Sequence, residues 1–352
     1  MRKVPTIILI LLLCLVCVNI PNIGLVKAQG TVYIRTDGSV EGTDKIQRDG
    51  YVYTFSGDVF DSMVVEKDNI VVDGAGFTLL GNGSGRGLDI SERSNVIVKN
   101  TQIDNFHYGI YVDNSLNIIV TGNNITNNTY GIDLVSSSRN NSISRNHIAN
   151  NEVFGIRLYF CPENEILENN ITNNNLSGIL LYFSDNNTLS ENNITANEWG
   201  INSYGSGYTN VSGNFITNNK IGLWFFGSSH NKIIRNNITD NQRSMYFEMQ
   251  AFDNTIYNNN IVDNIQQMFT DIDSVNVWDN GFEGNYWSNY TSTDNDSDGI
   301  GDSPYIIDEN NKDNYPLMEL VIIPEFPSWI ILPLFFTTTL VIIIYRKKLT
   351  TA

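Results

Sequence analysis

Basic residues and cysteines are scarce in this 352-residue sequence, and each shortage excludes a class of protein. Only 21 Lys and Arg residues stand against 38 Asp and Glu residues, so the formal net charge is −17. A chain without a basic surface cannot offset phosphate repulsion, and we therefore expect no nucleic-acid partner. Charged residues make up only 17% of the chain, and asparagine takes many of the polar positions that charges usually hold.

The three cysteines are too few, and too unevenly placed, for a disulfide framework. Cys14 and Cys17 lie in an apolar N-terminal segment, which leaves Cys161 as the one cysteine of the remaining chain. A single cysteine cannot form an internal disulfide. We interpret Cys161 as a small buried side chain rather than a nucleophile.

The N-terminal segment has the pattern of a secretory leader. Two early basic residues are followed by an apolar run from Ile7 to Val18, and the small residue Ala28 stands where cleavage could occur. This pattern predicts a signal peptide over residues 1–28, with an uncleaved N-terminal anchor as the alternative.

The C-terminal segment, residues 324–349, contains a second long apolar run. SWIILPLFFTTTLVIIIY (328–345) is long enough to span a membrane, and RKK (346–348) follows it. Positive charge after the span places the C-terminus in the cytoplasm and the rest of the chain outside. The preceding PEFPSW (324–329) resembles the archaeosortase-type PEF-CTERM sorting tail, which implies processing and a lipid-type anchor in place of the helix. In both cases we expect an extracellular body held at the membrane.

Glycine recurs through the middle of the chain with a period of 22 to 24 residues. The recurring positions are Gly87, Gly109, Gly131, Gly155, Gly178, Gly200 and Gly222, and Ser244 takes the next place. Each period contains three short apolar runs and no segment long enough for a helix. This predicts an all-β, right-handed parallel β-helix with three strands per coil. We expect regular coils over 87–264, an N-terminal cap and first coils over 31–86, and a C-terminal cap over 265–318. A leucine-rich repeat has a similar period, but it needs closely spaced leucines and a helical return segment.

Asparagine repeats at two fixed distances from the isoleucine of one recurring phrase, NNITNN. The position two before the isoleucine and the position three after it are asparagine in all seven copies, as in Asn123 and Asn128. Stacked amides can pass hydrogen bonds from coil to coil, and they can satisfy unpaired backbone groups at bends. A third column begins the middle strand, from Asn95 to Asn254. We therefore interpret the strict columns as scaffold.

The position directly before the isoleucine is less uniform, and we expect it to face outward. Four of its asparagines begin an Asn-x-Thr sequon, which makes them candidate glycosylation sites. These are Asn124, Asn170, Asn193 and Asn237.

Residues 31–318 resemble the archaeal NosD-type β-helix proteins, a family also described by carbohydrate-binding and sugar-hydrolase repeats. The resemblance is carried by IRTDGSVEGTDKIQRDG (34–50), NIVVDGAGFTL (69–79), the coils, NYWSNY and DSDGIGDSPYIID. It implies the fold, but fold does not determine chemistry. The family name implies copper handling, whereas this sequence has three histidines in all and no His/Met/Cys cluster of the kind copper prefers. We therefore expect no copper.

An aromatic column follows the glycine marker in successive coils. It comprises Tyr159, Tyr182, Tyr204 and Phe226 at the fourth position, and alternation points it outward. The outward second position carries Arg157, Asn202, Trp224 and Tyr246, which could add hydrogen bonds and stacking. Sugar rings stack on exposed aromatic surfaces, so the column is a candidate glycan-binding track. The alternative is an aromatic ladder that only stabilises the sheet.

Two carboxylates, Asp89 and Asp133, share the outward second position two coils apart. Their backbones are separated by about 9.6 Å at the usual strand spacing, a distance suited to an inverting glycosidase. Arg157 lies one coil beyond Asp133 and could simply pair with it. A lyase would also need a basic residue poised to take a proton, and no such cluster is evident.

The stretch DNDSDGIGD (294–302) resembles part of a calcium-binding loop. Asp294, Asp296, Asp298 and Asp302 offer oxygen ligands at alternating and later positions. The glutamate expected at the twelfth position is absent, because Tyr305 stands there. We interpret this stretch as a calcium-binding loop similar to the thrombospondin-type repeats, with a solvated acidic turn as the alternative.

Three functions remain open for this extracellular, membrane-tethered β-helix. We expect binding of polysaccharide or cell-surface glycans along the aromatic face. A glycosidase or polysaccharide lyase is the second hypothesis, and a purely structural surface-layer protein is the third.

Overall fold

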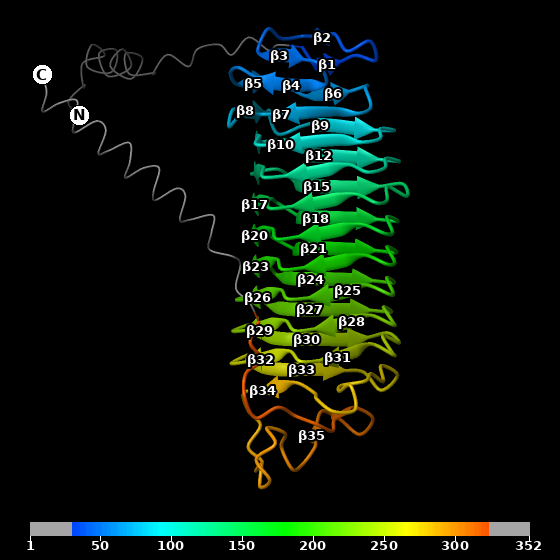
Figure 1. The fold of residues 1–352 in the computed structure, drawn as a ribbon, viewed down its shortest axis with the longest axis vertical. Coiled ribbons are helices and arrows are strands. Elements are labelled where there is room, and N and C mark those ends of the chain that lie inside the picture. The colour runs from blue at the N-terminus through cyan, green and yellow to red at the C-terminus, as the bar shows by residue number, and fades with distance from the viewer. Residues whose placement is uncertain (1–29, 324–352) are drawn as a thin grey trace, which may run out of the picture.

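The computed structural model describes residues 30–323, which form one elongated stack of short strands (Figure 1). The predicted leader (1–28) and C-terminal segment (324–349) lie outside the described residues. Within residues 30–323 no helix is long and apolar enough to cross a membrane. The predicted parallel β-helix is confirmed as an all-β parallel solenoid.

Three long sheets run the length of the solenoid, and we call them A, B and C. Sheet A has the strand order β2 (Val40–Glu41), β1 (Val32–Ile34), β6 (Met63–Val65), β9 (Arg86–Ser91), β12 (Tyr108–Asp113), β15 (Tyr130–Val135), β18 (Phe154–Tyr159), β21 (Ser177–Tyr182), β24 (Trp199–Tyr204), β27 (Ile221–Phe226), β30 (Arg243–Glu248) and β33 (Gln266–Thr270). Sheet B has the order β3 (Ile46–Asp49), β4 (Val52–Phe55), β7 (Ile70–Asp73), β10 (Val96–Lys99), β13 (Ile119–Thr121), β16 (Ser142–Ser144), β19 (Glu165–Leu167), β22 (Thr188–Ser190), β25 (Asn210–Ser212), β28 (Lys232–Ile234) and β31 (Thr255–Tyr257). Sheet C has the order β34 (Tyr286–Trp287), β32 (Asn260–Val262), β29 (Asn237–Thr239), β26 (Phe215–Thr217), β23 (Asn193–Thr195), β20 (Asn170–Thr172), β17 (His147–Ala149), β14 (Asn124–Thr126), β11 (Gln102–Asp104), β8 (Thr78–Leu80) and β5 (Val59–Phe60).

Each coil contributes one strand to each sheet, and equivalent residues pair in parallel register from coil to coil. In sheet A, Ile132 pairs with Ile110 on one side and with Ile156 on the other. The strands at the N-terminal end depart from this rule, because β1–β2 and β3–β4 are antiparallel. Beyond the last coil, β35 (Tyr305–Ile306) and β36 (Lys312–Asp313) form a separate antiparallel pair.

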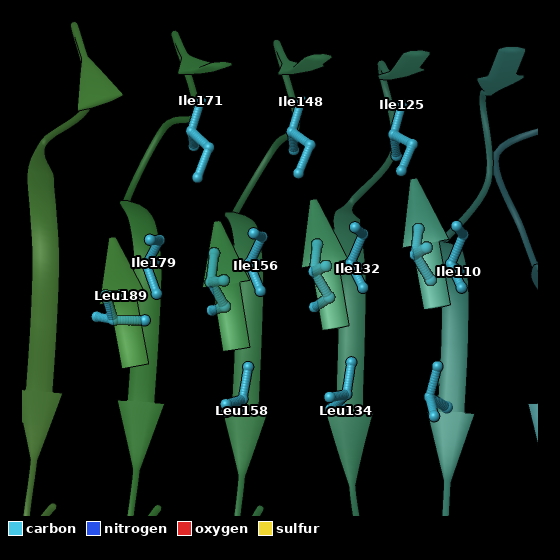
Figure 2. Close-up of a cluster of buried hydrophobic side chains, with 14 of the residues drawn as sticks. Ile110, Ile125, Ile132, Leu134, Ile148, Ile156, Leu158, Ile171, Ile179 and Leu189 are labelled. Atoms are coloured by element: carbon cyan, nitrogen blue, oxygen red, sulfur yellow. The ribbon is translucent and has the colours of Figure 1, made fainter. Parts of the chain in front are cut away.

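The core consists of aliphatic columns that run along the solenoid axis (Figure 2). Figure 2 shows one such column on sheet A, Ile110, Ile132, Ile156 and Ile179, and a second on sheet C, Ile125, Ile148 and Ile171. All are fully buried. Burying each isoleucine contributes about 2 kcal/mol, so the columns are the main source of stability.

The glycine column marks the corner at which sheet A begins. A Cβ atom on Gly131 would lie 2.4 Å from the carbonyl oxygen of Gly155 in the next coil. Adjacent coils therefore approach too closely at this corner for a side chain to pass between them. This contact explains why the period of the sequence is most visible in its glycines.

The two strict asparagine columns are buried and form continuous amide ladders, as predicted. The Nδ2 group of Asn146 donates to Oδ1 of Asn169 at 3.0 Å, and Asn169 donates in turn to Asn192 at 3.0 Å. The same Oδ1 atoms also accept the backbone N–H of the preceding coil. The residue before each ladder asparagine, such as Glu168 with φ of 54°, takes the left-handed backbone of the bend.

The third asparagine column differs from the expected alignment by one residue. Ile119 pairs with Ser142, so Ile118 rather than Asn117 lies beside Asn141. Asn117 instead stacks outside, where its amide donates to Asn95 at 3.0 Å. The buried column begins at Asn141, because Ile118 takes the inward position in the coil before it.

A serine column lies at the bend between sheets A and B, and Cys161 occupies one of its places. The backbone N–H of Cys161 donates to Oγ of Ser184 at 2.9 Å, as Ser115 does to Ser138 at 3.1 Å. Cys161 is fully buried, which confirms its interpretation as a small structural side chain. Burial raises the pKa of its thiol to about 12.

Candidate functional site

The outer face of sheet A, which we call the aromatic face, carries three columns of outward side chains. The first column contains Arg86, Tyr108, Tyr130, Phe154, Ser177, Trp199, Ile221 and Arg243. The second contains Asp89, Tyr111, Asp133, Arg157, Leu180, Asn202, Trp224 and Tyr246. The third contains Tyr159, Tyr182, Tyr204 and Phe226. Strand alternation therefore places the aromatic residues proposed from the sequence on one surface.

The third column forms a stacked ladder. Tyr159 and Tyr182 have ring centroids 4.9 Å apart and an interplanar angle of 8°, and Tyr182 and Tyr204 follow at 5.0 Å and 12°. Phe226 continues the stack at 4.6 Å from Tyr204. The faces of the inner rings are covered by their neighbours, so the ladder presents ring edges and phenol hydroxyls to solvent. A sugar can reach its hydroxyls but cannot stack on its inner faces.

A second aromatic column, which the sequence reasoning missed, lines the ladder. Phe160 and Phe183 stack at 5.4 Å, and each packs edge-on against the Tyr182 ring. Both are exposed large hydrophobic residues, and both have left-handed backbone. The repeated Tyr-Phe pair at 159–160 and 182–183 is the signal that could have identified it.

Asn202 lies in the middle column between bulky neighbours. Its strand neighbours in that column are Leu180 and Trp224, and the Trp224 ring packs edge-on against Trp199 with centroids 4.8 Å apart. The Asn202 residue is only 8% exposed. No hydrogen bond among the described residues involves its side-chain amide. It is therefore a largely covered hydrogen-bonding group beside the Trp224 position, without a protein partner among the described residues.

Toward the N-terminal end, the aromatic face carries charged side chains in paired form. Arg157 binds Asp133 through two contacts of 2.7 Å, and the Asp133 side chain is completely buried. Burial raises the pKa of Asp133, and the Arg157 guanidinium opposes this rise. Arg86 binds Asp89 at 2.7 Å and lies 3.6 Å from the centre of the Tyr111 ring.

The positions of Asp89 and Asp133 give little support to glycosidase chemistry. Tyr111 separates the two residues in the column, and each carboxylate is engaged by its own arginine. A general acid or base must reach the substrate, and the Asp133 carboxylate has no exposed surface. Their catalytic role stays a prediction that this geometry does not favour.

The acidic loop brings together three of its four proposed ligands. Single carboxylate oxygens of Asp294, Asp296 and Asp298 all lie within 4.8 Å of one another. The negative charge of Asp298 raises the pKa of Asp296. Asp302 is engaged elsewhere, because it accepts hydrogen bonds from Thr293 and Asn295. Within residues 30–323, no other His, Cys, Asp or Glu side chains form such a group.

The four sequon asparagines lie on the outer face of sheet C, as the alternation predicted. Asn124, Asn170, Asn193 and Asn237 are all partly exposed. Asn193 donates to Asn170 at 3.1 Å, and Asn170 contacts Nδ1 of His147. Their modification stays a prediction.

The repeat and the face together define a parallel β-solenoid with one strongly aromatic side. The model of the family described as "Periplasmic copper-binding protein (NosD)" matches residues 60–210 and 153–292. The chain therefore belongs to the NosD family. No curated protein matches it significantly in sequence.

The described residues do not fit the copper centre that the family description implies. His107 packs against Tyr108 and Tyr130, His147 contacts Asn170, and His230 faces Asp253 at 3.7 Å. The three histidines lie at β11–β12, in β17 and at β27–β28, so the fold does not gather them. Copper(I) prefers clustered soft ligands, whereas the thiol of Cys161 is buried and its pKa is raised to about 12.

Solved structures share the fold at low sequence identity. A crystal structure of the periplasmic alginate epimerase AlgG matches with a TM-score of 0.54 and 17% identity, covering 71% of this chain and 82% of that chain. The A-module of a mannuronan C-5 epimerase from Azotobacter vinelandii matches with 0.48 and 14%, covering 61% and 75%. PfbA, a surface adhesin of Streptococcus pneumoniae, matches with 0.42 and 13%, covering 58% and 64%. Of these three matches, only the one to AlgG has a TM-score above 0.5, and at 17% identity it establishes the fold alone.

Proposed function

We propose that this protein binds an extended polysaccharide along the aromatic face, on the outer side of the membrane. Asn202 is the observation that carries the proposal. Asn202 is 8% exposed and pairs with Trp224 in the next strand, and its amide reaches the surface with no hydrogen-bond partner among the described residues, so its donors and acceptor are open to a ligand. A sugar hydroxyl would satisfy the amide while the indole rings pack on the sugar. Polar groups placed among aromatic side chains are typical of ligand sites.

The tyrosine ladder extends this site along the solenoid. Tyr159, Tyr182 and Tyr204 repeat at about one coil spacing, with ring centroids 4.9 and 5.0 Å apart. Their hydroxyl edges form a row comparable in spacing to the sugar units of an extended chain. Trp224, Tyr246 and Arg157 border the row in the middle column. The proposed contact is therefore through hydroxyl edges at the ladder and through ring packing at the indoles.

The proposed location rests on sequence and family. The leader over 1–28 would export the chain, and the segment over 324–349 would hold it at the membrane, either as a helix or after processing. The family description as periplasmic agrees with export.

Binding is best tested with the full-length protein, purified in detergent, against a panel of neutral and acidic polysaccharides that includes alginate. We expect one class to bind and Asn202→Ala to weaken that binding at least tenfold. Tyr182→Phe should weaken it by a smaller factor, because only a hydroxyl is lost. Glu165→Ala, an exposed change on sheet B, is the matched control and should have no effect.

Two results would overturn the proposal. Equal affinities of the wild type and Asn202→Ala would exclude the amide as the centre of the site. Failure of every polysaccharide to bind would favour a purely structural surface role.

An enzyme acting on polysaccharide is the second candidate. His107, whose ring lies 4.4 Å from Tyr108 and 5.3 Å from Tyr130, places groups capable of proton transfer near the Arg157 side chain. Released reducing ends or unsaturated sugars would support this reading. Loss of such products in Asp133→Asn, with binding retained, would assign Asp133 a part in the reaction.

We also propose that Asp294, Asp296 and Asp298 hold a calcium ion in the C-terminal cap. Calcium takes carboxylate oxygens from flexible loops, and these three carboxylates converge within 4.8 Å. Bound calcium would relieve the repulsion by which Asp298 raises the pKa of Asp296.

A further inference from the structure

A groove of about 440 Å³ lies on the outer face of sheet C, away from the aromatic face. It is lined by Asn170, Asn193, Phe215, Thr217, Asn237 and Thr239, which come from four successive strands, β20, β23, β26 and β29. Phe215 stands where the neighbouring coils have asparagine, because it pairs with Asn193 and Asn237. The groove thus combines amides and hydroxyls with one aromatic wall.

The last described residues of the chain lead toward this groove. After the cap, Leu317 forms a parallel bridge with Tyr286 of β34. The chain then reaches β32, where Val321 donates its N–H to Oδ1 of Asn260 at 2.8 Å and accepts from Nδ2 of Asn260 at 2.9 Å. The chain therefore runs from β34 across β32 toward the strands that line the groove.

A single side chain joins the end of the chain to the groove. The Asn260 amide that holds Val321 also donates to Oδ1 of Asn237, a lining residue, at 2.6 Å. Ile323 is only 8% exposed, whereas Ile322 is 93% exposed. This alternation indicates an extended segment with one side packed on sheet C.

The lengths of the groove and of the adjoining sequence agree. Asn260, Asn237, Phe215, Asn193 and Asn170 occupy successive coils. From Asn260 to Asn170 is four strand spacings, or about 19 Å, which about six extended residues would span. Counting from Val321, six residues end at Pro327, so residues 324–327, Pro-Glu-Phe-Pro, match the length of the groove.

We propose that residues 324–327 occupy this groove and strap the C-terminal segment to the flank of the solenoid. The two prolines have no N–H to pair, so this stretch cannot add to a sheet as a central strand. Its carbonyl groups are suited to the amide donors of Asn193 and Asn170, and the spacing places Phe326 at the coil of Asn193, one coil beyond Phe215, where its ring can reach the Phe215 wall. The segment that follows would leave the protein from sheet C, which keeps the aromatic face free for ligand.

The strap and the sequons of this face exclude one another. Asn170, Asn193 and Asn237 line the groove and are also candidate glycan acceptors. A sugar on any of them would fill the space that the strap needs. Asn124, which is not among the lining residues, is the sequon that the strap leaves open.

Cysteine cross-linking tests the strap in the full-length protein. The background carries serine at positions 14, 17 and 161, and the last change fits the serine column around Cys161. We expect Asn193→Cys and Phe326→Cys together to form an intramolecular disulfide under mild oxidation, identified by mass spectrometry of peptides, because the spacing places Phe326 at the coil of Asn193. The matched pair, Lys232→Cys with Phe326→Cys, should not, because Lys232 is an exposed residue of sheet B.

Thiol alkylation provides a second measurement that does not depend on forming a bond. The Asn193→Cys thiol should react with a maleimide at least tenfold faster when Phe326→Ala is added, while the Lys232→Cys thiol should not change. Equal cross-linking of the two pairs, or unchanged alkylation, would overturn the proposal. A disulfide between two molecules would assign the groove to a second copy, and sugar found on Asn193 or Asn237 would assign it to a glycan.

Discussion

At the scale of the residue, the amide ladders need an acceptor at their C-terminal ends. In the ladder of Asn169, each Nδ2 group donates one hydrogen bond to the next coil and others to backbone carbonyls. The last Nδ2 group, on Asn285, reaches Oδ2 of Asp313 at 3.3 Å. The same carboxylate oxygen accepts the backbone N–H of Asn285 at 2.7 Å and Nε1 of Trp287 at 2.9 Å. A carboxylate only accepts, so Asp313 ends the ladder without leaving a donor unpaired.

The burial of Asp313 predicts a pH-dependent stability. Burial raises its pKa from 3.8 to about 6. The folded chain therefore binds a proton that the unfolded chain has released, and stability should fall as the pH rises from about 4 to about 6. The expected loss is about 3 kcal/mol. Denaturant unfolding across this range measures it.

Asp313→Asn is the variant that isolates this effect. The neutral side chain should flatten the pH dependence of the unfolding free energy between about pH 4 and 6, because the titrating group is gone. An unchanged slope in the variant would show that another group is responsible. Asp133 is the other fully buried carboxylate with a raised pKa, and its pairing with Arg157 opposes the effect of burial.

At the scale of the element, the ladders hold successive coils in register. Asn169 accepts two hydrogen bonds from Asn146 and donates to the carbonyl of Ile143 at 2.8 Å as well as to Asn192. Removing this amide leaves buried partners unsatisfied on both neighbouring coils. Buried unpaired groups cost more than an ordinary hydrogen bond contributes.

Asn169→Ala should therefore lower the unfolding free energy by about 4 kcal/mol. The matched control is Asn170→Ala, because Asn170 lies beside it in sequence but on the outer face of sheet C. We expect that change to cost less than about 1 kcal/mol. Urea unfolding of the two variants decides the point, and similar losses in both would show that the inner ladder has no special role.

The stacked tyrosines show the same dependence on neighbouring coils. Alternation along one strand makes Tyr182 point outward, but its ring orientation comes from Tyr159 and Tyr204, at 4.9 and 5.0 Å. Aromatic pairs gain energy from such packing. A row of stacked rings is therefore both a stabilising element and a set of hydroxyl edges.

At the scale of the whole molecule, the solenoid separates its surfaces by function. The proposed glycan site lies on sheet A and the proposed strap on sheet C, while the acidic loop belongs to the C-terminal cap. This cap covers the last coil with Trp278 and Trp287, which are both buried, and Tyr305 stacks on Trp287 at 4.2 Å. An open solenoid end exposes unpaired strand edges and apolar side chains. The stability of the solenoid therefore depends on the cap that covers this end.

Calcium should therefore stabilise the whole protein through its cap. We expect the melting temperature to be higher in calcium than in chelator, because an ion that binds only the folded state shifts the unfolding equilibrium. Asp296→Asn should remove the difference. Asp273→Asn, an exposed change in the cap region outside the cluster, should preserve the difference in melting temperature. A wild-type melting temperature that does not change with chelator would contradict the proposed calcium site.

The sequence was sufficient to predict the solenoid because its signals are local and repeated. The glycine period, the inward isoleucines and the two strict asparagine columns each follow from alternation within one coil, and the structure confirms them. The alignment failed at Asn117, where a one-residue shift put Ile118 in the buried place. Repetition could not reveal that shift, because both residues fit the local pattern.

The tertiary structure alone decided how side chains meet between coils. Residues that touch there are 22 to 26 positions apart in sequence, as in Arg157 with Asp133 and Asn169 with Ile143. Their geometry depends on rotamers and on neighbours in both adjoining coils. For this reason the burial of Asp133, the covered faces of the tyrosine rings and the unpartnered amide of Asn202 became evident only in the folded chain. The period of the sequence determined the shape, and contacts across that period determined the chemistry of its surface.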